Sequence, residues 1–330
     1  MKFVQSRRAF GKTLGKASLA GLAATLAPLG NARAADAALS FQSIWINDPE
    51  FIGYFIALDK GYYTAEGIDL TYIPGGPDVI PQAALLTGKA EIGLTSLIET
   101  ATAVAEKGAP FKIIGAQFQK SPDSVISLAE SGIRSIKDLA GKSVACPPLS
   151  LISFKVLLSL NGVSEDAVKI VPYAFDPTPL ASGEVDAVVD FMTSLPFIVE
   201  QSSGKKASYM LFYDVGLPFG QDLVTVTDDS LRTRRKEIVA FMRASRKGWQ
   251  DGFADPARYV AAYQDSWFKG NGVSPEAALF HSRTQIGLMQ NPNGVYAMDA
   301  DWIDKNLATL DKVGVKASRA LFDASVLAEL

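Results

Sequence analysis

Short apolar segments alternate along the chain with longer segments in which apolar residues recur at helical spacing. The first kind predicts strands and the second predicts amphipathic helices. In the first part of the chain we expect strands at 39–46, 68–74, 90–96 and 111–118, with helices between them at 51–60, 81–87 and 98–107. Gly61, Gly88 and Gly108 follow the three helices, as expected at helix C-termini. This alternation predicts an α/β fold with mainly parallel sheets.

A second α/β block follows, with strands expected at 124–130, 143–146, 168–173, 183–191, 208–214 and 221–229. From Ser230 onward the pattern is almost entirely helical. Two such blocks and a helical C-terminal region predict two lobes, each a mainly parallel sheet flanked by helices, with the chain crossing between them twice. We place lobe 1 at 35–125 and 222–330, and lobe 2 at 126–221.

Charge is distributed unevenly between the amino terminus and the rest of the chain. The 330 residues carry a formal net charge of -3, and 48% of them are hydrophobic, which is a globular composition. Residues 1–35 contain six basic and no acidic residues, which leaves 26 basic against 35 acidic residues after them. Because phosphate binding needs a concentrated basic surface, this acidic body argues against a nucleic-acid partner.

The amino-terminal segment has the layout of a cleavable export peptide. A basic stretch at 6–12 precedes an apolar, alanine-rich run at 17–30, and Ala32-Arg33-Ala34 follows as a cleavage site. The pair Arg7 and Arg8 resembles the twin-arginine signal. We therefore expect residues 1–34 to be a twin-arginine export signal, read by the twin-arginine machinery and cleaved near Ala34. The protein would then be periplasmic, and no lipobox cysteine follows the signal to tether it.

Cysteine and histidine each occur once, as Cys146 and His281. One thiol forms no internal disulfide, and these counts exclude a metal cluster built from cysteine and histidine. His281 lies in a helical stretch, and we expect it on the helix surface rather than against a ligand. The chain has no GxSxG or HExxH motif, so we expect no catalytic residue, metal or cofactor, although carboxylate or lysine chemistry stays open.

Candidate binding residues stand where strands end, because ligands gather at the carboxyl ends of strands in open α/β sheets. After the first strand come Trp45, Asp48, Phe51 and Tyr54. Aromatic rings beside polar side chains suit a planar heterocycle. The alternative, that Trp45 and Phe51 belong to the core, stays open.

The later strands offer further candidates: Gly76, Ser96, Gln117, Asp190 and Phe191. Gly76 belongs to a loop where glycines allow close approach of the backbone to a ligand, although a plain tight turn is the simpler explanation and ranks above it. Asp190 would accept hydrogen bonds from a ring amine or pair with a cation. Its alternative role is to cap the following helix.

Five segments together carry a family resemblance. They read DPEFIGYFIALDKGYYTAEGIDLTYIPGG, LLTGKAEIGLTS, SGIRSIKDLAGKSVAC, LASGEVDAVVDF and DVGLPFGQDLVTVTDD. In this order they resemble the sulfonate and thiamine-precursor group of ABC importer binding proteins, over residues 39–310. The resemblance implies a type II periplasmic-binding-protein fold, in which two lobes close on a small solute. It also implies a non-enzymatic monomer that delivers its solute to an ABC permease in the cytoplasmic membrane.

Within that group the chain looks more like the pyrimidine and riboflavin branches than the alkylsulfonate branch, on the Trp45 position and the stretches 214–218 and 298–302. The resemblance implies that Trp45, Tyr54 and Phe191 stack on the ring of riboflavin or a thiamine pyrimidine precursor. It implies that Asp190 and Gln117 bind the ring edges.

Two alternatives stay open. The same clamp could bind an organosulfonate, a nitrate-like anion or an aromatic acid, but arginine, which such anions need, is sparse in the candidate loops. The chain could also be an exported, cofactor-bearing enzyme. The related fungal enzymes that make the thiamine pyrimidine from their own histidine and a pyridoxal phosphate lysine have a cysteine-rich iron motif, and this chain, with one cysteine, departs from them.

Overall fold

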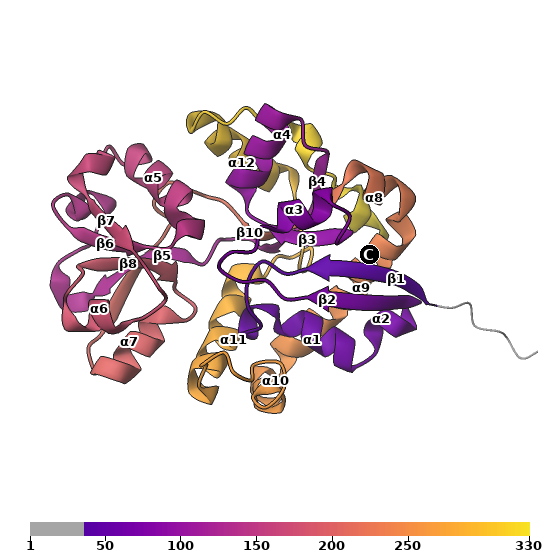
Figure 1. Ribbon diagram of the computed structural model, residues 1–330, viewed down its shortest axis with the longest axis horizontal. Helices are drawn as coiled ribbons and strands as arrows, with labels where there is room; N and C mark the ends of the chain where they lie inside the picture. The colour runs from indigo at the N-terminus through magenta and orange to yellow at the C-terminus, as the bar shows by residue number, and fades with distance from the viewer. Residues whose placement is uncertain (1–35) are drawn as a thin grey trace, which may run out of the picture. The chain divides into compact units, whose positions relative to one another are not determined.

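The computed structural model describes residues 36–330, which form two five-stranded sheets (Figure 1). Sheet A has the strand order β2-β1-β3-β10-β4, and sheet B has the order β7-β6-β8-β5-β9. The strands of sheet A are β1 (Ala37–Gln42), β2 (Ile68–Ile73), β3 (Ile92–Thr95), β4 (Phe111–Phe118) and β10 (Gln221–Thr227). Those of sheet B are β5 (Asp123–Leu128), β6 (Ser143–Cys146), β7 (Lys169–Pro172), β8 (Ala187–Phe191) and β9 (Ala207–Leu211).

Helices flank both sheets, and the region after β10 is helical, which confirms the predicted α/β class. The α-helices are α1 (Ile52–Asp59), α2 (Tyr62–Ala65), α3 (Pro81–Leu86), α4 (Leu97–Lys107), α5 (Leu151–Leu160), α6 (Thr178–Ser182), α7 (Leu195–Ser203), α8 (Asp228–Thr233), α9 (Arg235–Ala254), α10 (Pro256–Tyr263), α11 (Pro275–Met289) and α12 (Ala300–Lys312). Short 3-10 helices are η1 (Pro49–Phe51), η2 (Ala129–Ser131), η3 (Ile136–Leu139), η4 (Pro148–Ser150), η5 (Glu165–Ala167), η6 (Arg319–Leu321) and η7 (Ala324–Glu329).

Both sheets are mixed, and the route of the chain explains why. β1 is parallel to β2 and β3, and β6 is parallel to β7 and β8. In contrast, β10 is antiparallel to β3 and β4, and β5 is antiparallel to β8 and β9. The chain enters β5 and β10 directly from the other sheet, through residues 119–122 and 212–220. A strand entered without a crossover helix starts where its neighbours end, so it runs against them.

Helices α1 and α9 pack directly on one another because glycine stands at the contact in each. A Cβ atom at Gly248 would lie 2.0 Å from the carbonyl oxygen of Gly53. A Cβ atom at Gly53 would lie 2.3 Å from the ring of Trp249. Trp249 is fully buried, and its indole N–H donates to the Tyr296 hydroxyl at 3.1 Å. This close packing fixes α1, and with it the loop between β1 and α1.

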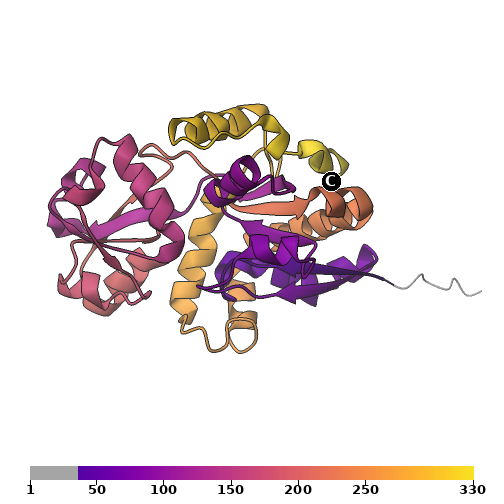
Figure 2. The same cartoon turned by 45° about the horizontal axis from the view of Figure 1, so that its top comes forward.

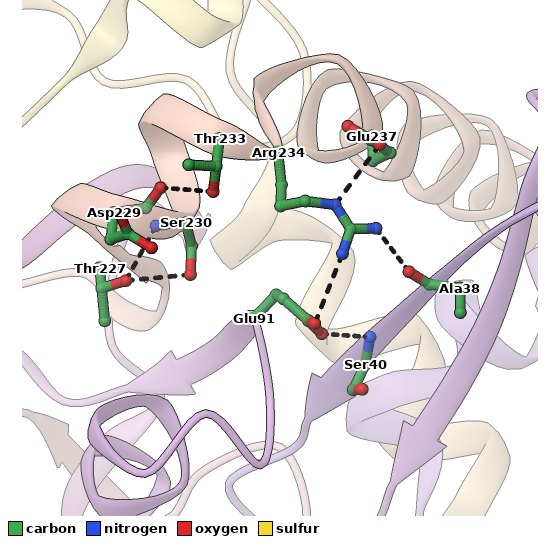
Figure 3. Close-up of polar contacts among 9 residues, drawn as sticks. All are labelled: Ala38, Ser40, Glu91, Thr227, Asp229, Ser230, Thr233, Arg234 and Glu237. Carbon is green, nitrogen blue, oxygen red and sulfur yellow. Dashed lines mark hydrogen bonds and ion pairs between the residues drawn. The ribbon is translucent and has the colours of Figure 1, made fainter.

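Arg234 ties the returning chain to the beginning of sheet A (Figure 3). Its guanidinium donates to the carbonyl oxygen of Ala38 at 2.5 Å, and lies 3.6 Å from a carboxylate oxygen of Glu91 and 3.4 Å from one of Glu237. Glu91 also accepts from the backbone N–H of Ser40 at 2.7 Å. These groups are partly exposed, so each pair contributes about 1 kcal/mol or less. The network holds β1, β3 and α9 together at the end of the sheet away from the strand-end loops.

The expected export signal at 1–34 and its cleavage site near Ala34 lie outside the described residues. Within residues 36–330, no helix is both long enough and apolar enough to span a membrane.

Candidate ligand-binding site

A cavity of about 270 Å³ lies where loops from both sheets converge. Sheet A contributes the loops after β1 and β3, and sheet B contributes the loops after β6, β7 and β8. Helix α11, the gold-orange helix that stands between the sheets in Figure 2, adds one wall. The acidic, histidine and aromatic residues that line the cavity are Trp45, Asp48, Glu50, Asp123, Tyr173, Phe175, Asp190, Phe191 and His281.

The Trp45 loop is held in place by the loop after β2. The strand β1 ends at Gln42, earlier than the sequence pattern predicts, and the Gln42 side-chain amide donates to the carbonyl oxygens of Ile73 (3.3 Å) and Pro74 (3.1 Å). The backbone N–H of Gly75 donates to the carbonyl oxygen of Trp45 at 2.9 Å. A Cβ atom at Gly75 would lie 2.3 Å from the carbonyl carbon of Ile44. Glycine is therefore required here, for contact with the Trp45 loop.

Aromatic rings from both sheets meet at the cavity. The half-buried ring of Trp45, after β1, lies 4.7 Å from the ring of Phe175, after β7, between centroids. Phe175 in turn lies 5.2 Å from Tyr173. Phe175 has a φ of 59° and is 39% exposed, an unusual conformation for a bulky residue. Offset and tilted rings of this kind form an apolar surface on which a flat ring can pack.

Asp48 presents a carboxylate to the cavity at the start of η1. Its Oδ1 accepts from the backbone N–H of Glu50 at 2.8 Å, which caps the 3-10 turn. Desolvation raises the pKa of Asp48 to about 7, with smaller contributions from repulsion by Asp222 and Asp190. The backbone hydrogen bond acts in the opposite direction. The Asp48 carboxyl thus titrates near neutral pH.

Glu50 and Asp222 form a buried carboxyl pair behind the cavity. They are 2% and 0% exposed, and their side chains hydrogen-bond one another. The Gln117 amide donates to Oδ2 of Asp222 at 2.9 Å and to the backbone carbonyl of Glu50 at 3.0 Å. Desolvation raises the pKa of both carboxyls, and repulsion from neighbouring acidic groups adds to it. The pair therefore shares a proton under conditions in which exposed carboxyls have lost theirs.

Sheet B brings two more carboxyls to the same cavity. Asp190 accepts from the backbone N–H of Phe191 at 2.6 Å and from the Tyr173 hydroxyl at 2.9 Å. Asp123 accepts from the hydroxyls of Ser121 (2.9 Å) and Ser150 (3.2 Å). Desolvation raises the pKa of each to about 6. Asp190 does not cap α7, whose N-cap residue is Ser194.

His281 lies in the cavity wall and not on a helix surface, so the expectation for this residue was wrong. It is 4% exposed and lines the cavity together with Ala277, one turn earlier on α11. Its Nε2 is buried and has no hydrogen-bond partner among the described residues. Burial lowers the pKa of His281 to about 3, so the imidazole stays neutral.

The structure brings five of the nine candidate residues together at the cavity: Trp45, Asp48, Ser96, Asp190 and Phe191. Phe51, Tyr54 and Gln117 are fully buried and do not line it, and neither does Gly76. Tyr54 packs in the core, with its ring 6.0 Å from that of Phe241. The position of Gln117 behind the carboxyl pair gives it a positioning role rather than a contact with the cavity.

Sequence reasoning missed Glu50, Asp123, Tyr173, Phe175 and His281. Tyr173 and Phe175 follow a strand directly, so the rule that identified Trp45 applies to them as well. Asp123 is the first residue of its strand, and only the antiparallel direction of β5 brings it to the cavity. For His281 the sequence offers one signal. It lies four residues after Ala277, so the two share one face of the helix, and an apolar neighbour on that face indicates a buried position.

Comparison with known proteins identifies the family. Residues 48–259, more than half of the chain, match the family described as NMT1/THI5 like. The chain belongs to the NMT1/THI5-like family. The matched residues begin at Asp48 of the cavity and include all the strands of sheet B.

Curated relatives of this NMT1/THI5-like chain include binding proteins and enzymes. The riboflavin-binding protein RibY of Chloroflexus aurantiacus is 24% identical over 71% of this chain and 68% of its own length. A formylaminopyrimidine-binding protein of Halalkalibacterium halodurans is 24% identical over 78% of this chain and 79% of its own. The 4-amino-5-hydroxymethyl-2-methylpyrimidine phosphate synthase of Schizosaccharomyces pombe is 26% identical over 68% of each chain.

Solved structures show the fold of this family member. The alkanesulfonate-binding protein SsuA of Xanthomonas axonopodis pv. citri superposes with a TM-score of 0.61 at 18% identity, over 88% of this chain and 96% of that one. A Candida albicans protein described as having the generic periplasmic binding protein fold superposes with a TM-score of 0.59 at 16% identity, over 89% and 94%. The predicted periplasmic-binding-protein fold is thereby confirmed.

Proposed function

We propose that this protein is the extracytoplasmic solute-binding component of an ABC importer and that it holds a planar nitrogen heterocycle between two lobes. Sheet A with the helices after β10 would move as one lobe and sheet B as the other, so the lobe boundary expected at residue 125 moves to the linker before β5, which begins at Asp123. The observation that carries the proposal is the meeting of Trp45 and Phe175, from different sheets, over a cavity edged with carboxylates. The names of the riboflavin- and formylaminopyrimidine-binding relatives support the same class of ligand.

Stacking and edge hydrogen bonds would supply the affinity. A flat ring between the two aromatic walls buries apolar area that is exposed in the open protein. The acidic side chains and the Nε2 of His281 offer hydrogen-bonding partners at the ring edges. Closure excludes water from these contacts and so strengthens each of them. The closed form would then dock on a membrane permease, after export through the twin-arginine route to the periplasm.

Binding rather than catalysis is the proposed role, although the family also contains enzymes. Binding proteins and pyrimidine phosphate synthases both occur among the relatives. The cavity lining contains His281 but no lysine or cysteine side chain. A lysine is what a pyridoxal phosphate enzyme needs for its Schiff base. We therefore rank the exported enzyme below the solute-binding protein.

The anion-binding alternative receives no support from the cavity. Sulfonates and carboxylates are held by arginine or by clustered N–H donors. The lining residues include neither arginine nor lysine, and several of them are carboxylates, which repel an anion.

Calorimetric titration with riboflavin and with 4-amino-5-hydroxymethyl-2-methylpyrimidine tests the proposal. We expect one of the two to bind with a dissociation constant of about 10 μM or tighter, and to quench tryptophan fluorescence through Trp45. Absence of binding for every flavin and pyrimidine tried would contradict the heterocycle assignment. Conversion of the ligand to a product of different mass would favour the enzyme.

A further inference from the structure

All the charged side chains that line the cavity are acidic. Asp48 and Glu50 enter it from η1 and its cap, and Asp123 and Asp190 enter it from sheet B. No lysine or arginine is among the lining residues. The ion pairs within residues 36–330 involve none of these four carboxylates. Acidic groups are thus concentrated in the cavity without a counter-ion from the described part of the chain.

Hydrogen bonds from neighbouring groups already compensate Asp123 and Asp190 in part, whereas Asp48 has an oxygen left for a positively charged guest. A buried carboxylate is normally paired or fully hydrogen-bonded, because desolvation of the isolated charge is expensive. In the described residues Oδ2 of Asp48 accepts no hydrogen bond, although Oδ1 is used by the η1 cap. Repulsion from Asp190 contributes to the raised pKa of Asp48, so the two carboxyls are electrostatically coupled. A cation between them would relieve this repulsion and pair with the free oxygen.

A separate observation also indicates a ligand. His281 is 4% exposed, lines the cavity, and has a buried Nε2 without a partner among the described residues. A buried ring nitrogen left without a hydrogen bond is unfavourable, because nothing compensates its loss of contact with water. Because burial keeps this imidazole neutral, it adds no positive charge to the cavity. It remains available for one hydrogen bond with a guest.

The aromatic wall, and the absence of a metal-ligating cluster among the described residues, favour an organic cation over a metal ion. Cations bind over the faces of tryptophan, tyrosine and phenylalanine, and the cavity has all three in Trp45, Tyr173 and Phe175. Within residues 36–330, no group of three or more His, Cys, Asp or Glu side chains is arranged to hold a metal ion. A ring that carries its own positive charge satisfies both the carboxylates and the aromatic faces.

The geometry points to a planar organic cation as the solute, with its ring against Trp45 and Phe175 and its positive charge between Asp48 and Asp190. This inference rests on the proposed solute-binding function and adds the charge class of the ligand. It predicts that protonated or quaternary nitrogen in the guest raises affinity, whereas a neutral guest of the same shape binds more weakly.

Two pairs of probes with matched shape and different charge test the inference by calorimetry. The first pair is 4-amino-5-aminomethyl-2-methylpyrimidine, a cation, and its neutral 5-hydroxymethyl analogue. The second is 1-methylnicotinamide, a cation, and neutral nicotinamide. At about pH 8, above the pKa of about 7 of Asp48, we expect the cation of at least one pair to bind about tenfold or more tightly than its partner.

Matched variants assign the preference to the two carboxylates. Asp48→Asn keeps an oxygen for the N–H of Glu50, so the η1 cap survives. We expect Asp48→Asn and Asp190→Asn each to reduce the cation preference to about threefold or less. Asp166→Asn, an exposed change in η5 outside the cavity lining, should leave it unchanged. Circular dichroism checks that each variant is folded.

The possible results separate this inference from the proposed function. Equal affinity within both pairs, or tighter binding of the neutral members, overturns the cation inference and leaves heterocycle binding standing. A preference that survives in both Asp variants overturns the assignment to Asp48 and Asp190. If none of the four probes binds at millimolar concentration while riboflavin does, the cation inference fails alone. If riboflavin fails to bind as well, both fail.

Discussion

The rings of Trp45 and Phe175 lie 4.7 Å apart between centroids, at an interplanar angle of 53°, although they follow strands of different sheets. Their contact joins the two walls of the cavity at one point. A guest that enters between the walls must separate these rings and then replace the contact that each one loses. The pair therefore reports directly on whether a flat ligand occupies the cavity.

Replacing either ring should weaken binding with little effect on folding. We expect Trp45→Ala to lower the affinity for the bound heterocycle about 10- to 100-fold, because an aromatic anchor is lost. Both rings are partly exposed, so the free energy of unfolding should fall by about 1 kcal/mol or less. Tyr209→Ala, at a residue 47% exposed on β9, is the matched control and should leave affinity unchanged. Calorimetry and urea unfolding measure the two effects.

A substitution at Phe175 should reduce ligand affinity without reducing the stability of the fold. Its φ of 59° is unfavourable for a bulky residue, whereas asparagine adopts this region readily. We expect Phe175→Asn to lower ligand affinity without lowering the urea midpoint. A clear loss of stability in this variant would mean that the ring supports the fold rather than the site.

Gly75 should be essential to the position of the Trp45 loop. A methyl group at Gly75 would clash with the carbonyl carbon of Ile44 at 2.3 Å, whereas one at Gly76 would find its nearest neighbours at 3.9 Å. We expect Gly75→Ala to destabilise the protein by about 1–3 kcal/mol and to weaken binding. Gly76→Ala, the adjacent control, should do neither. Equal behaviour of the two variants in unfolding and titration experiments would refute this account of the loop.

Replacing one carboxyl of the buried Glu50 and Asp222 pair with an amide should stabilise the protein at high pH. As the pH rises above neutral, the Glu50 and Asp222 pair loses its shared proton, and two negative charges then repel one another in a buried site. We expect Glu50→Gln to raise the free energy of unfolding by about 1–2 kcal/mol at pH 8 and to change it little at pH 5. Glu106→Gln, at an exposed position, is the control. Urea unfolding at both pH values gives the result, and destabilisation at pH 8 would contradict it.

The ligand-free protein should lose stability as the pH rises from about 5 to 7. The folded-state pKa values of Asp123 and Asp190 are raised to about 6 and that of Asp48 to about 7. In this window the folded state therefore binds more protons than the unfolded chain, and stability falls with pH. His281 acts in the opposite direction, because its pKa is lowered to about 3, but it is one group against several carboxyls. Thermal unfolding at constant ionic strength measures this effect. A midpoint temperature that rose between pH 5 and pH 7 would contradict the prediction.

Local sequence pattern was sufficient for most elements of the fold. The strand expected at 111–118 coincides with β4, because its apolar run is bounded by Pro110 and by polar residues. The first strand was predicted to reach Ile46, but it ends at Gln42, where the loop after β2 takes over the backbone hydrogen bonds. Strand direction in β5 and β10 was also missed, because the length and route of the linkers decide it and side-chain alternation does not.

The site could be predicted only in part from the sequence, because tertiary packing as well as local pattern decides which side chains reach the cavity. The strand-end rule identified Trp45, Asp48 and Asp190, whose positions follow from the sheet itself. Phe51 and Tyr54 are close to them in sequence, but the η1 turn and helix α1 rotate both rings into the core. His281 reaches the cavity from a helix more than two hundred residues after Trp45, and only tertiary packing brings it there.

Native mass spectrometry of the protein, purified without refolding, tests the central claim most directly when it is repeated on the Trp45→Ala, Phe175→Ala double variant. The account predicts a single small-molecule adduct on the wild-type chain, identified as a planar nitrogen heterocycle, and its loss from the double variant. An anionic adduct such as a sulfonate, or an adduct that the double variant retains, would contradict it.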